Sequence, residues 1–418
     1  MKRGDRLKQE EAMANPIDSK AGDGRTGRAG APGGSVLRDA RRYGILAVLA
    51  AIVLLFQVLT GGLLLTPNNV ASLVQQNAYV LILSVGMLMV IVGRHIDLSV
   101  GSVVGFIGGV VGILIVNFSL PWPVAVLVAF ALGALIGCWH GFWVAVMEIP
   151  AFIVTLASML MFRGLTVLLL QRTVSGLPAD FVGIANGSLP PWLGYLCNFD
   201  GVTILIGVFA IAALVFMRLR ARRESQKVGK EVSPVAWEVV RLLVEAGAIG
   251  IVTALLAYSA GGTPIVLVIV GAVVLAYSFL MNRTVFGRHI YAVGGNLKAA
   301  LLSGVNVRRV DFMLFVNMGL LSALAAIVTT SRAGAAISTA GNLYEMDAIA
   351  AVFIGGAAVS GGVGRVSGTI AGALIMGVLN MGLSIMGVDS AWQQAIKGLV
   401  LLLAVAVDVA AKRRGSSR

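Results

Sequence analysis

Residues 77–93 read NAYVLILSVGMLMVIVG and end an apolar run that has no Asp, Glu, Lys or Arg anywhere in 43–93. A second stretch, 98–147, also lacks these four residue types. The hydrocarbon core of a bilayer is about 30 Å thick, and a helix of about 20 residues crosses it. Each stretch has room for two such helices, so the two runs predict membrane-spanning segments.

The whole chain has the composition of a polytopic membrane protein. Of its 418 residues, 58% are hydrophobic and 12% are charged, and the mean hydropathy is +0.92. A soluble enzyme, a secreted disulfide scaffold and a disordered regulator each need more charge, more cysteine or less apolar surface. We therefore predict an all-α transmembrane bundle of about 10–12 spans, which can include half-helices.

Turn residues divide the apolar runs into separate predicted spans. These fall near 43–65, 77–93, 98–117, 123–147, 151–170, 201–217, 242–261, 264–281, 312–330, 369–387 and 392–411. A further apolar run at 347–360 is too short for a full span and predicts a half-helix before a glycine-rich bend at 360–368. Free backbone groups of a broken helix must be covered by protein or by a water-filled cavity, so this run predicts the lining of a pathway.

Positive charge predicts the topology of the chain. The net charge is +13, with 10 Lys and Arg residues in 1–42, 7 in 218–241, 5 in 282–311 and 4 in 412–418. Cytoplasmic segments retain cations during insertion, so both termini and the two loops are predicted in the cytoplasm and 171–200 outside. The expected contact of this charge is anionic lipid, with no binding of nucleic acid.

The domain organisation follows from the same pattern. We predict a disordered cytosolic basic tail at 1–42, a transmembrane domain at 43–411 and a second cytosolic basic tail at 412–418. Gly133 and Gly137 are four residues apart inside a span, a spacing that lets helices pack closely in lipid.

Polar residues inside or beside the spans are candidates for a solute pathway. Hydroxyl and amide side chains suit an uncharged solute such as a sugar, because each solute hydroxyl stripped of water needs a partner. Hydrogen bonding between helices is the alternative explanation. The candidates for the path or its gate are Asp97, Ser99, Thr155, Arg163, Asn317, Glu345, Asp347 and Asn380.

Several of these candidates carry charge. Arg163 lies inside a span and either forms a structural ion pair or lies beside the pathway. Asp97 precedes a helix and is expected to cap it, and the same interpretation holds for Glu345 and Asp347, with gating as the alternative. The segments 96–99 and 345–348 both place a carboxylate before a glycine-rich helix, although the match is too short to establish a repeat.

Three other charged residues, Glu245, Lys397 and Asp408, lie near span ends, where their side chains are expected to reach toward the membrane surface.

Motifs for enzyme chemistry are missing from the sequence. The histidines lack the HExxH spacing, Cys138 and Cys197 lack the CxxC spacing and are expected to be free thiols, and no P-loop occurs. We predict no metal site, no cofactor and no enzyme activity, so any ATP must be hydrolysed by another chain.

The loop at 284–304 reads TVFGRHIYAVGGNLKAALLSG. Asn296 is a good N-cap and Gly304 a good stop, so a helix of about seven residues is predicted between them. Such a short helix is marginal alone in water, so it is expected to dock against the membrane surface or a partner protein. Leu297, Ala300 and Leu301 share one face, and if this face docks on a partner protein, Ala300→Arg is expected to leave the protein inserted but uncoupled from that partner.

Three segments in order resemble the permease subunits of bacterial carbohydrate ABC importers, the family of ribose, galactoside, arabinose and xylose permeases. They are GRHIDLSVGS at 93–102, FGR at 286–288 with AVGGN at 292–296 and the residues to 304, and DAIAAVFIGG at 347–356. The resemblance covers 43–412, and the extra stretch at 218–262 looks most like the xylose-type permeases. Arg94-His95 departs from the glycine or small residues that relatives usually carry at this turn.

The resemblance implies a permease that forms the translocation path for a monosaccharide, xylose or a related pentose, and works as a dimer in the bacterial inner membrane. Its implied partners are an ATP-binding subunit, a periplasmic sugar-binding protein, a second permease copy and membrane lipid. The residues implied to couple it to the ATP-binding subunit are Gly287, Arg288, Gly294, Asn296, Ala299, Ala300, Ser303 and Gly304.

Two alternatives remain open on sequence alone. A secondary transporter or channel for a small neutral solute would need an ion site or proton-relay carboxylates near the midplane, and the predicted spans place none there. An intramembrane enzyme would need paired His or Asp residues that the predicted spans lack.

Overall fold

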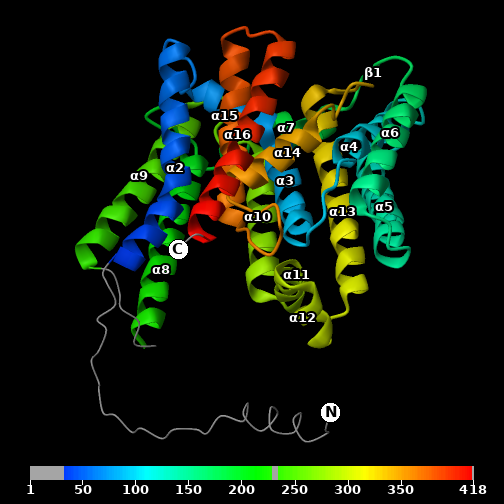
Figure 1. The fold of residues 1–418 in the computed structure, drawn as a ribbon. Helices are drawn as coiled ribbons and strands as arrows, with labels where there is room; N and C mark the ends of the chain where they lie inside the picture. Colours follow the sequence, from blue (N-terminus) through cyan, green and yellow to red (C-terminus); the bar gives the residue numbers. More distant parts are fainter. Residues whose placement is uncertain (1–32, 228–233, 417–418) are drawn as a thin grey trace, which may run out of the picture. The chain divides into compact units, whose positions relative to one another are not determined.

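The computed structural model describes residues 33–227 and 234–416, with side chains described for 44–227 and 234–406. The chain divides into two units, 1–43 and 44–418. Residues 1–32 and the charged side chains of the predicted C-terminal tail, as well as Asp408, lie outside this description. The second unit is a helical bundle, so the predicted all-α architecture is confirmed (Figure 1).

The helices match the predicted spans closely. They are α2 (Gly33–Leu59), α3 (Pro67–Val92), α4 (Val100–Val116), α5 (Trp122–Gly141), the π-helical turn η2 (Phe142–Val146), α6 (Ala151–Leu169), α7 (Ala179–Asn186), α8 (Gly201–Lys227), α9 (Val235–Tyr258), α10 (Ile265–Arg283), α11 (Val285–Gly295), α12 (Leu297–Leu302), α13 (Val307–Ala333), α14 (Tyr344–Ile354), α15 (Val366–Ile385) and α16 (Ser390–Ser416). Among the described residues, 8 helices are long and apolar enough to cross a membrane, and shorter apolar helices accompany them. The chain is therefore a multi-pass membrane protein.

Some helix ends differ from the prediction. α2 begins at Gly33, ahead of the apolar run, and α8 and α9 continue into the charged loop predicted at 218–241. Arg, Lys and Glu are good helix formers, so a span can continue as a helix beyond the apolar segment that identified it. α7 and α11 were not predicted, because each is too short for its apolar residues to show a clear helical repeat.

Four two-residue strands accompany the helices in the described part of the chain. β1 (Val174–Ser175) pairs antiparallel with β4 (Ala335–Ala336), with Val174 opposite Ala336. β2 (Tyr195–Leu196) pairs antiparallel with β3 (Phe199–Asp200). The β1–β4 pair ties the loop after α6 to the chain that follows α13.

The core of the bundle is built around α3 and α13. α3 is the most completely buried of the long apolar helices, and α13 packs against α3, α4 and α5. Gly319 of α13 lies so close to Gly133 and Gly137 of α5 that a Cβ atom at Gly319 would collide with the backbone of both. The predicted close helix packing is therefore confirmed for these two glycines.

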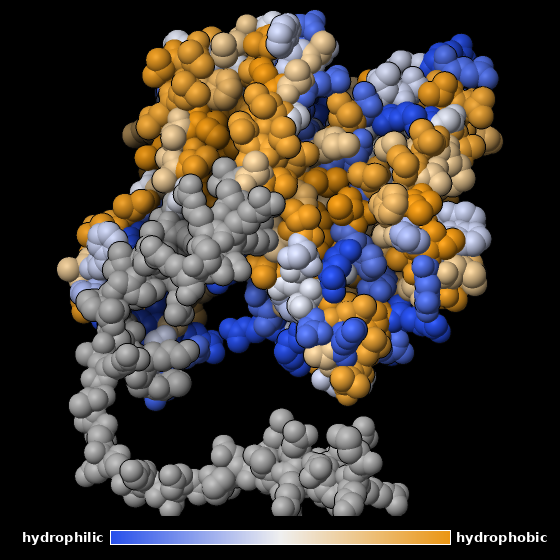
Figure 2. All heavy atoms as spheres, in the orientation of Figure 1, coloured by the Kyte–Doolittle hydropathy of each residue, from blue (hydrophilic) through white to orange (hydrophobic). Residues whose placement is uncertain are grey.

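Other helices pack on this core or on each other. α14 packs against α3 and α15, α16 packs against α14, and α8 pairs with α9. Apolar residues cover much of the face shown in Figure 2, as a surface in contact with lipid requires.

Candidate functional site

Two short helices begin inside the bundle, at the same place. The first turn of α4 contains Gly101, and a Cβ atom there would meet the Gly341 carbonyl oxygen and the carboxylate of Glu345, which is in the first turn of α14. Tyr79, midway along α3, stacks on Tyr344 at the start of α14 with ring centroids 3.7 Å apart. Both short helices therefore start level with the middle of α3.

From this junction the two helices run in opposite directions. Gly112 of α4 lies against Ala336, just beyond the end of α13. Beyond α14, the Gly362 N–H donates a 2.9 Å hydrogen bond to the Val92 carbonyl at the end of α3. α14 has 11 residues, too few to cross the membrane, which agrees with the half-helix predicted at 347–360. The two echoing segments in the sequence thus meet, N-terminus to N-terminus.

The chain leading into α4 is buried and bonded. Asp97 accepts hydrogen bonds from the Ser99 amide at 2.9 Å and the Ser99 hydroxyl at 2.6 Å, and the Thr155 hydroxyl donates to the Ile96 carbonyl at 3.3 Å. Ser99 is the N-cap of α4, so Asp97 bonds to the capping residue and not to the first turn as predicted. These bonds satisfy non-helical backbone at membrane depth.

Arg163 lies on α6 beside the same junction. Its Nη1 donates a 3.0 Å hydrogen bond to the Ala340 carbonyl, in the segment leading into α14. Glu345 is within electrostatic range of Arg163, but among the described contacts the two form no ion pair. The Arg163 side chain therefore stabilises the non-helical segment by bonding to the backbone of that segment.

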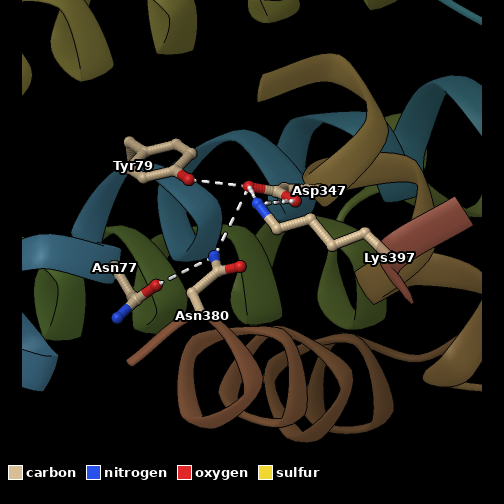
Figure 3. Close-up of polar contacts among 5 residues, drawn as sticks. All are labelled: Asn77, Tyr79, Asp347, Asn380 and Lys397. Carbon is tan, nitrogen blue, oxygen red and sulfur yellow. Dashed lines mark hydrogen bonds and ion pairs between the residues drawn. The ribbon is translucent and has the colours of Figure 1, made fainter. Parts of the chain in front are cut away.

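Asp347, also in the first turn of α14, is the centre of a buried polar cluster (Figure 3). Its Oδ2 accepts from the Tyr79 hydroxyl at 2.7 Å and from the Asn380 amide at 3.5 Å, and its Oδ1 lies 3.2 Å from the Lys397 Nζ. Asn380 also donates to Asn77 Oδ1 at 3.4 Å. The cluster joins α3, α14, α15 and α16.

Lys397 does not reach for the membrane surface as predicted. Its side chain is 20% exposed and points inward to Asp347, which is 2% exposed. The cost of burying the carboxylate makes a cationic partner favourable even at a span end. Glu245, for which the same behaviour was predicted, pairs with Arg218.

Most of the predicted pathway residues therefore lie near the junction, but one does not. Asn317 accepts a hydrogen bond from the Tyr277 hydroxyl of α10 at 3.2 Å and donates to the Met313 carbonyl of its own helix. Asn77, Tyr79 and Lys397 were missed, because nothing in an apolar sequence indicates which polar side chains face one another. The expectation of no carboxylate at this depth was wrong, since Asp347 bonds to Tyr79, midway along α3.

The loop at 284–304 forms two capped helices. The Thr284 hydroxyl accepts from the Gly287 amide at 3.1 Å, and Asn296 Oδ1 accepts from the Ala299 amide at 3.0 Å, so Asn296 is the N-cap of α12 as predicted. Ser303 is its C-cap, and Gly304 follows with φ +78°, a conformation that favours glycine.

Two contacts attach these helices to the bundle. A Cβ at Gly294 would collide with the Val92 carbonyl and the Gly362 backbone, so glycine is needed there. The Tyr291 hydroxyl donates to the Gly364 carbonyl at 2.8 Å. Burial raises the pKa of the Tyr291 phenol. These contacts attach α11 to the end of α3 and to the segment between α14 and α15.

The exposed face of α12 differs from the predicted one. Ala300 is 4% exposed and belongs to the core, whereas Leu301 is 54% and Leu302 is 90% exposed. At the position that α12 has in Figure 1, Figure 2 shows a group of apolar atoms bordered by hydrophilic ones. The expectation for Ala300→Arg was therefore wrong in its reason, because an arginine there would disrupt packing and not a docking surface. Arg288 is exposed on α11.

The unusual turn at Arg94-His95 lines a pocket of about 420 Å³ with Glu148 and Asp311. Arg94 has φ 73°, in the left-handed region where glycine is favoured. His95 Nε2 lies 3.2 Å from Asp311 Oδ1, and Arg308 donates to Glu148 at 2.6 Å. His95 thus joins the end of α3 to the start of α13.

Cys138 and Cys197 are free thiols, as predicted. In the part of the chain that the structure describes, no group of three or more His, Cys, Asp and Glu residues could hold a metal ion.

Comparison with known proteins identifies related chains. Residues 69–405 match the family model described as branched-chain amino acid transport system / permease component. The xylose transport system permease protein XylH of Escherichia coli K12 is 42% identical over 373 residues, which are 88% of this chain and 92% of the relative. XylH of Haemophilus influenzae is 38% identical over 89% of this chain and 97% of the relative, and the ribose import permease protein RbsC of Escherichia coli K12 is 37% identical over 82% and 86%. No solved structure matches the chain at a significant level.

Proposed function

Because this chain belongs to the family of permease components that its residues 69–405 match, we propose that it is the membrane-spanning permease of an ATP-driven sugar importer. It forms the translocation path for a monosaccharide, most simply D-xylose, and is itself no enzyme. The observation that carries the proposal is the 42% identity to a xylose permease across nearly the full length of both chains.

The chemistry of the junction supports a neutral solute. The family description mentions branched-chain amino acids, whereas XylH and RbsC are named for xylose and ribose. Asp347 already pairs with Lys397, so neither charge of this pair is free to hold a zwitterionic amino acid. Hydroxyl and amide groups such as those of Tyr79 and Asn380 suit a polyhydroxylated molecule.

The exposed face of α12 supports a docking role. Leu301 and Leu302 present apolar side chains on a six-residue helix, and Leu302 is 90% exposed. We assign α11 and α12, with Gly287, Arg288, Gly294, Asn296, Ala299, Ala300, Ser303 and Gly304, to the coupling loop that an ATP-binding subunit holds. Ala300 serves this loop from inside by anchoring α12 to the bundle.

The remaining partners and the location follow from the same assignment. The protein pairs with a second copy in the bacterial inner membrane, surrounded by lipid, and has both termini and the coupling loop in the cytoplasm. A periplasmic sugar-binding protein delivers the solute to the outer loops, including 171–200 and 331–346.

One observation favours the alternative, a secondary transporter or channel for a small neutral solute. Glu345 is a carboxylate 4% exposed near the middle of the bundle, where proton- or ion-coupled carriers keep such residues. The source of energy distinguishes the two functions.

The test is transport by the complex of this chain with its ATP-binding subunit, reconstituted in liposomes with the sugar-binding protein. Uptake of labelled D-xylose is expected to require hydrolysable ATP and to be absent with a proton or sodium gradient alone. Leu302→Asp is expected to lower both ATPase binding and uptake about 10-fold or more, because a charge replaces a central apolar contact. Leu219→Asp, at a 53% exposed leucine between two arginines on α8 and outside both the coupling loop and the outer loops, is the matched control. Uptake driven by an ion gradient without ATP would establish the alternative.

A further inference from the structure

The first turn of α4 presents backbone donors that have no partner within the helix. The Val103 amide is the first to bond inside it, to the Ser99 carbonyl at 2.9 Å. The amides of residues 100–102 precede it, so they are among the free N–H groups that every helix start leaves. Such a start also carries a partial positive charge of about half an elementary charge.

Two buried side chains at this place lack hydrogen-bond partners among the described residues. Glu345 is 4% exposed and its Oε2 has no partner, and Ser102 is 1% exposed with an unpartnered hydroxyl. Glu345 reaches from α14 across to α4, because its Oε2 is the atom that a Cβ at Gly101 would meet first. Buried polar atoms are nearly always bonded, so orphaned atoms from two facing helices point to a ligand.

The charges around the junction nearly cancel. Three carboxylates, Asp97, Glu345 and Asp347, face two cations, Arg163 and Lys397, and the two helix starts add about one positive charge together. A cation would need an excess of negative charge, and an anion an excess of positive charge. A neutral group that both donates and accepts hydrogen bonds fits this balance.

Resting on the proposed function, we infer that the junction of α4 and α14 is the closed gate of the pathway and binds a sugar hydroxyl when it opens. The hydroxyl donates to Glu345 Oε2 and accepts from a free amide or from the Ser102 hydroxyl of α4, since a hydroxyl has one donor and two acceptor positions. In this structure Glu345 and Gly341 fill the space over Gly101, so α4 and α14 must separate for the sugar to pass.

The first test compares variants in the reconstituted complex with ATP and labelled D-xylose. Glu345→Gln keeps the size and one acceptor but loses the charge, so uptake is expected to fall about 10-fold, and Glu345→Ala about 100-fold, with assembly and basal ATP hydrolysis retained. Glu224→Gln, at a 60% exposed acid on α8, is the matched control. If the Glu345→Gln variant takes up D-xylose as fast as the wild type does, this inference alone is overturned. If the wild-type complex itself imports no D-xylose, the proposed function is overturned as well.

The second test does not depend on Glu345 variants folding. Ser102→Cys, in a background with Cys138→Ala and Cys197→Ser, is treated with a membrane-impermeant thiol reagent. The thiol is expected to react at least 10-fold faster during ATP turnover than at rest, and D-xylose is expected to slow the reaction. A thiol that stays equally protected during turnover, or that sugar does not protect, places Ser102 outside the pathway and overturns the inference.

Discussion

Asp347 is a charged residue that is stable at its buried position only because three other helices supply partners. Tyr79 of α3 and Asn380 of α15 donate hydrogen bonds, and Lys397 of α16 supplies the counter-charge. Removing one member of such a pair leaves an uncompensated buried charge, which is more costly than replacing both members.

We expect Lys397→Met to destabilise the protein by about 3 kcal/mol, since Asp347 loses its cation while it stays buried. The double variant Lys397→Met with Asp347→Asn is expected to recover most of this loss. Thermal unfolding of the detergent-purified protein measures both.

Lys227→Met is the matched control, because Lys227 is exposed at the end of α8. If Lys397→Met is as stable as the wild type, or the double variant is no better than the single one, the ion pair does not stabilise the contact between α14 and α16.

At the scale of elements, helix contacts in this protein depend on small residues. Lipid tails are as apolar as leucine, so helices associate by close packing and not by hiding apolar surface. Gly319 lets α13 approach α5 until its Cα faces the backbone of Gly133 and Gly137. By contrast, a Cβ at Gly271 of α10 would meet nothing within 4 Å.

Gly319→Ala is therefore expected to destabilise the bundle by about 1–3 kcal/mol through overpacking. Gly271→Ala, the same change in another helix, is expected to be neutral or to stabilise by up to about 1 kcal/mol through helix propensity. Comparing the melting temperatures of the two variants checks this, and equal shifts would show that α5 and α13 do not need the close approach.

At the scale of the whole bundle, α4 and α14 enter from opposite sides and meet N-terminus to N-terminus. Each follows a long helix and a segment that is not helical, 93–99 before α4 and 334–343 before α14. Inverted arrangements of this kind place solute sites near the middle of a membrane. Three candidate spans, α8, α9 and α10, separate the loop at 187–200 from α12, so the two are expected on opposite sides of the membrane.

Labelling with a membrane-impermeant thiol reagent tests this topology. Cys197 is exposed in the loop proposed to face outward and is expected to react in right-side-out vesicles. Leu302→Cys, in a Cys197→Ser background, is expected to react only after permeabilisation. Reaction of Leu302→Cys from outside would invert the topology and remove the coupling assignment.

The helices, the half-helix and the capped loop could be predicted because each depends on local sequence. An apolar run of sufficient length spans a membrane wherever its neighbours lie, and Asn296 caps α12 through an amide three residues away. The sequence alone therefore determined the all-α fold, the approximate positions of its spans and the short capped helix α12.

Only the tertiary structure decided which side chains meet. Apolar residues face both lipid and protein in a membrane, so hydropathy does not tell the inner face of a helix from the outer one. For this reason the partner of Lys397, the inward position of Ala300 and the meeting of Glu345 with Gly101 depend on contacts between residues far apart in the chain.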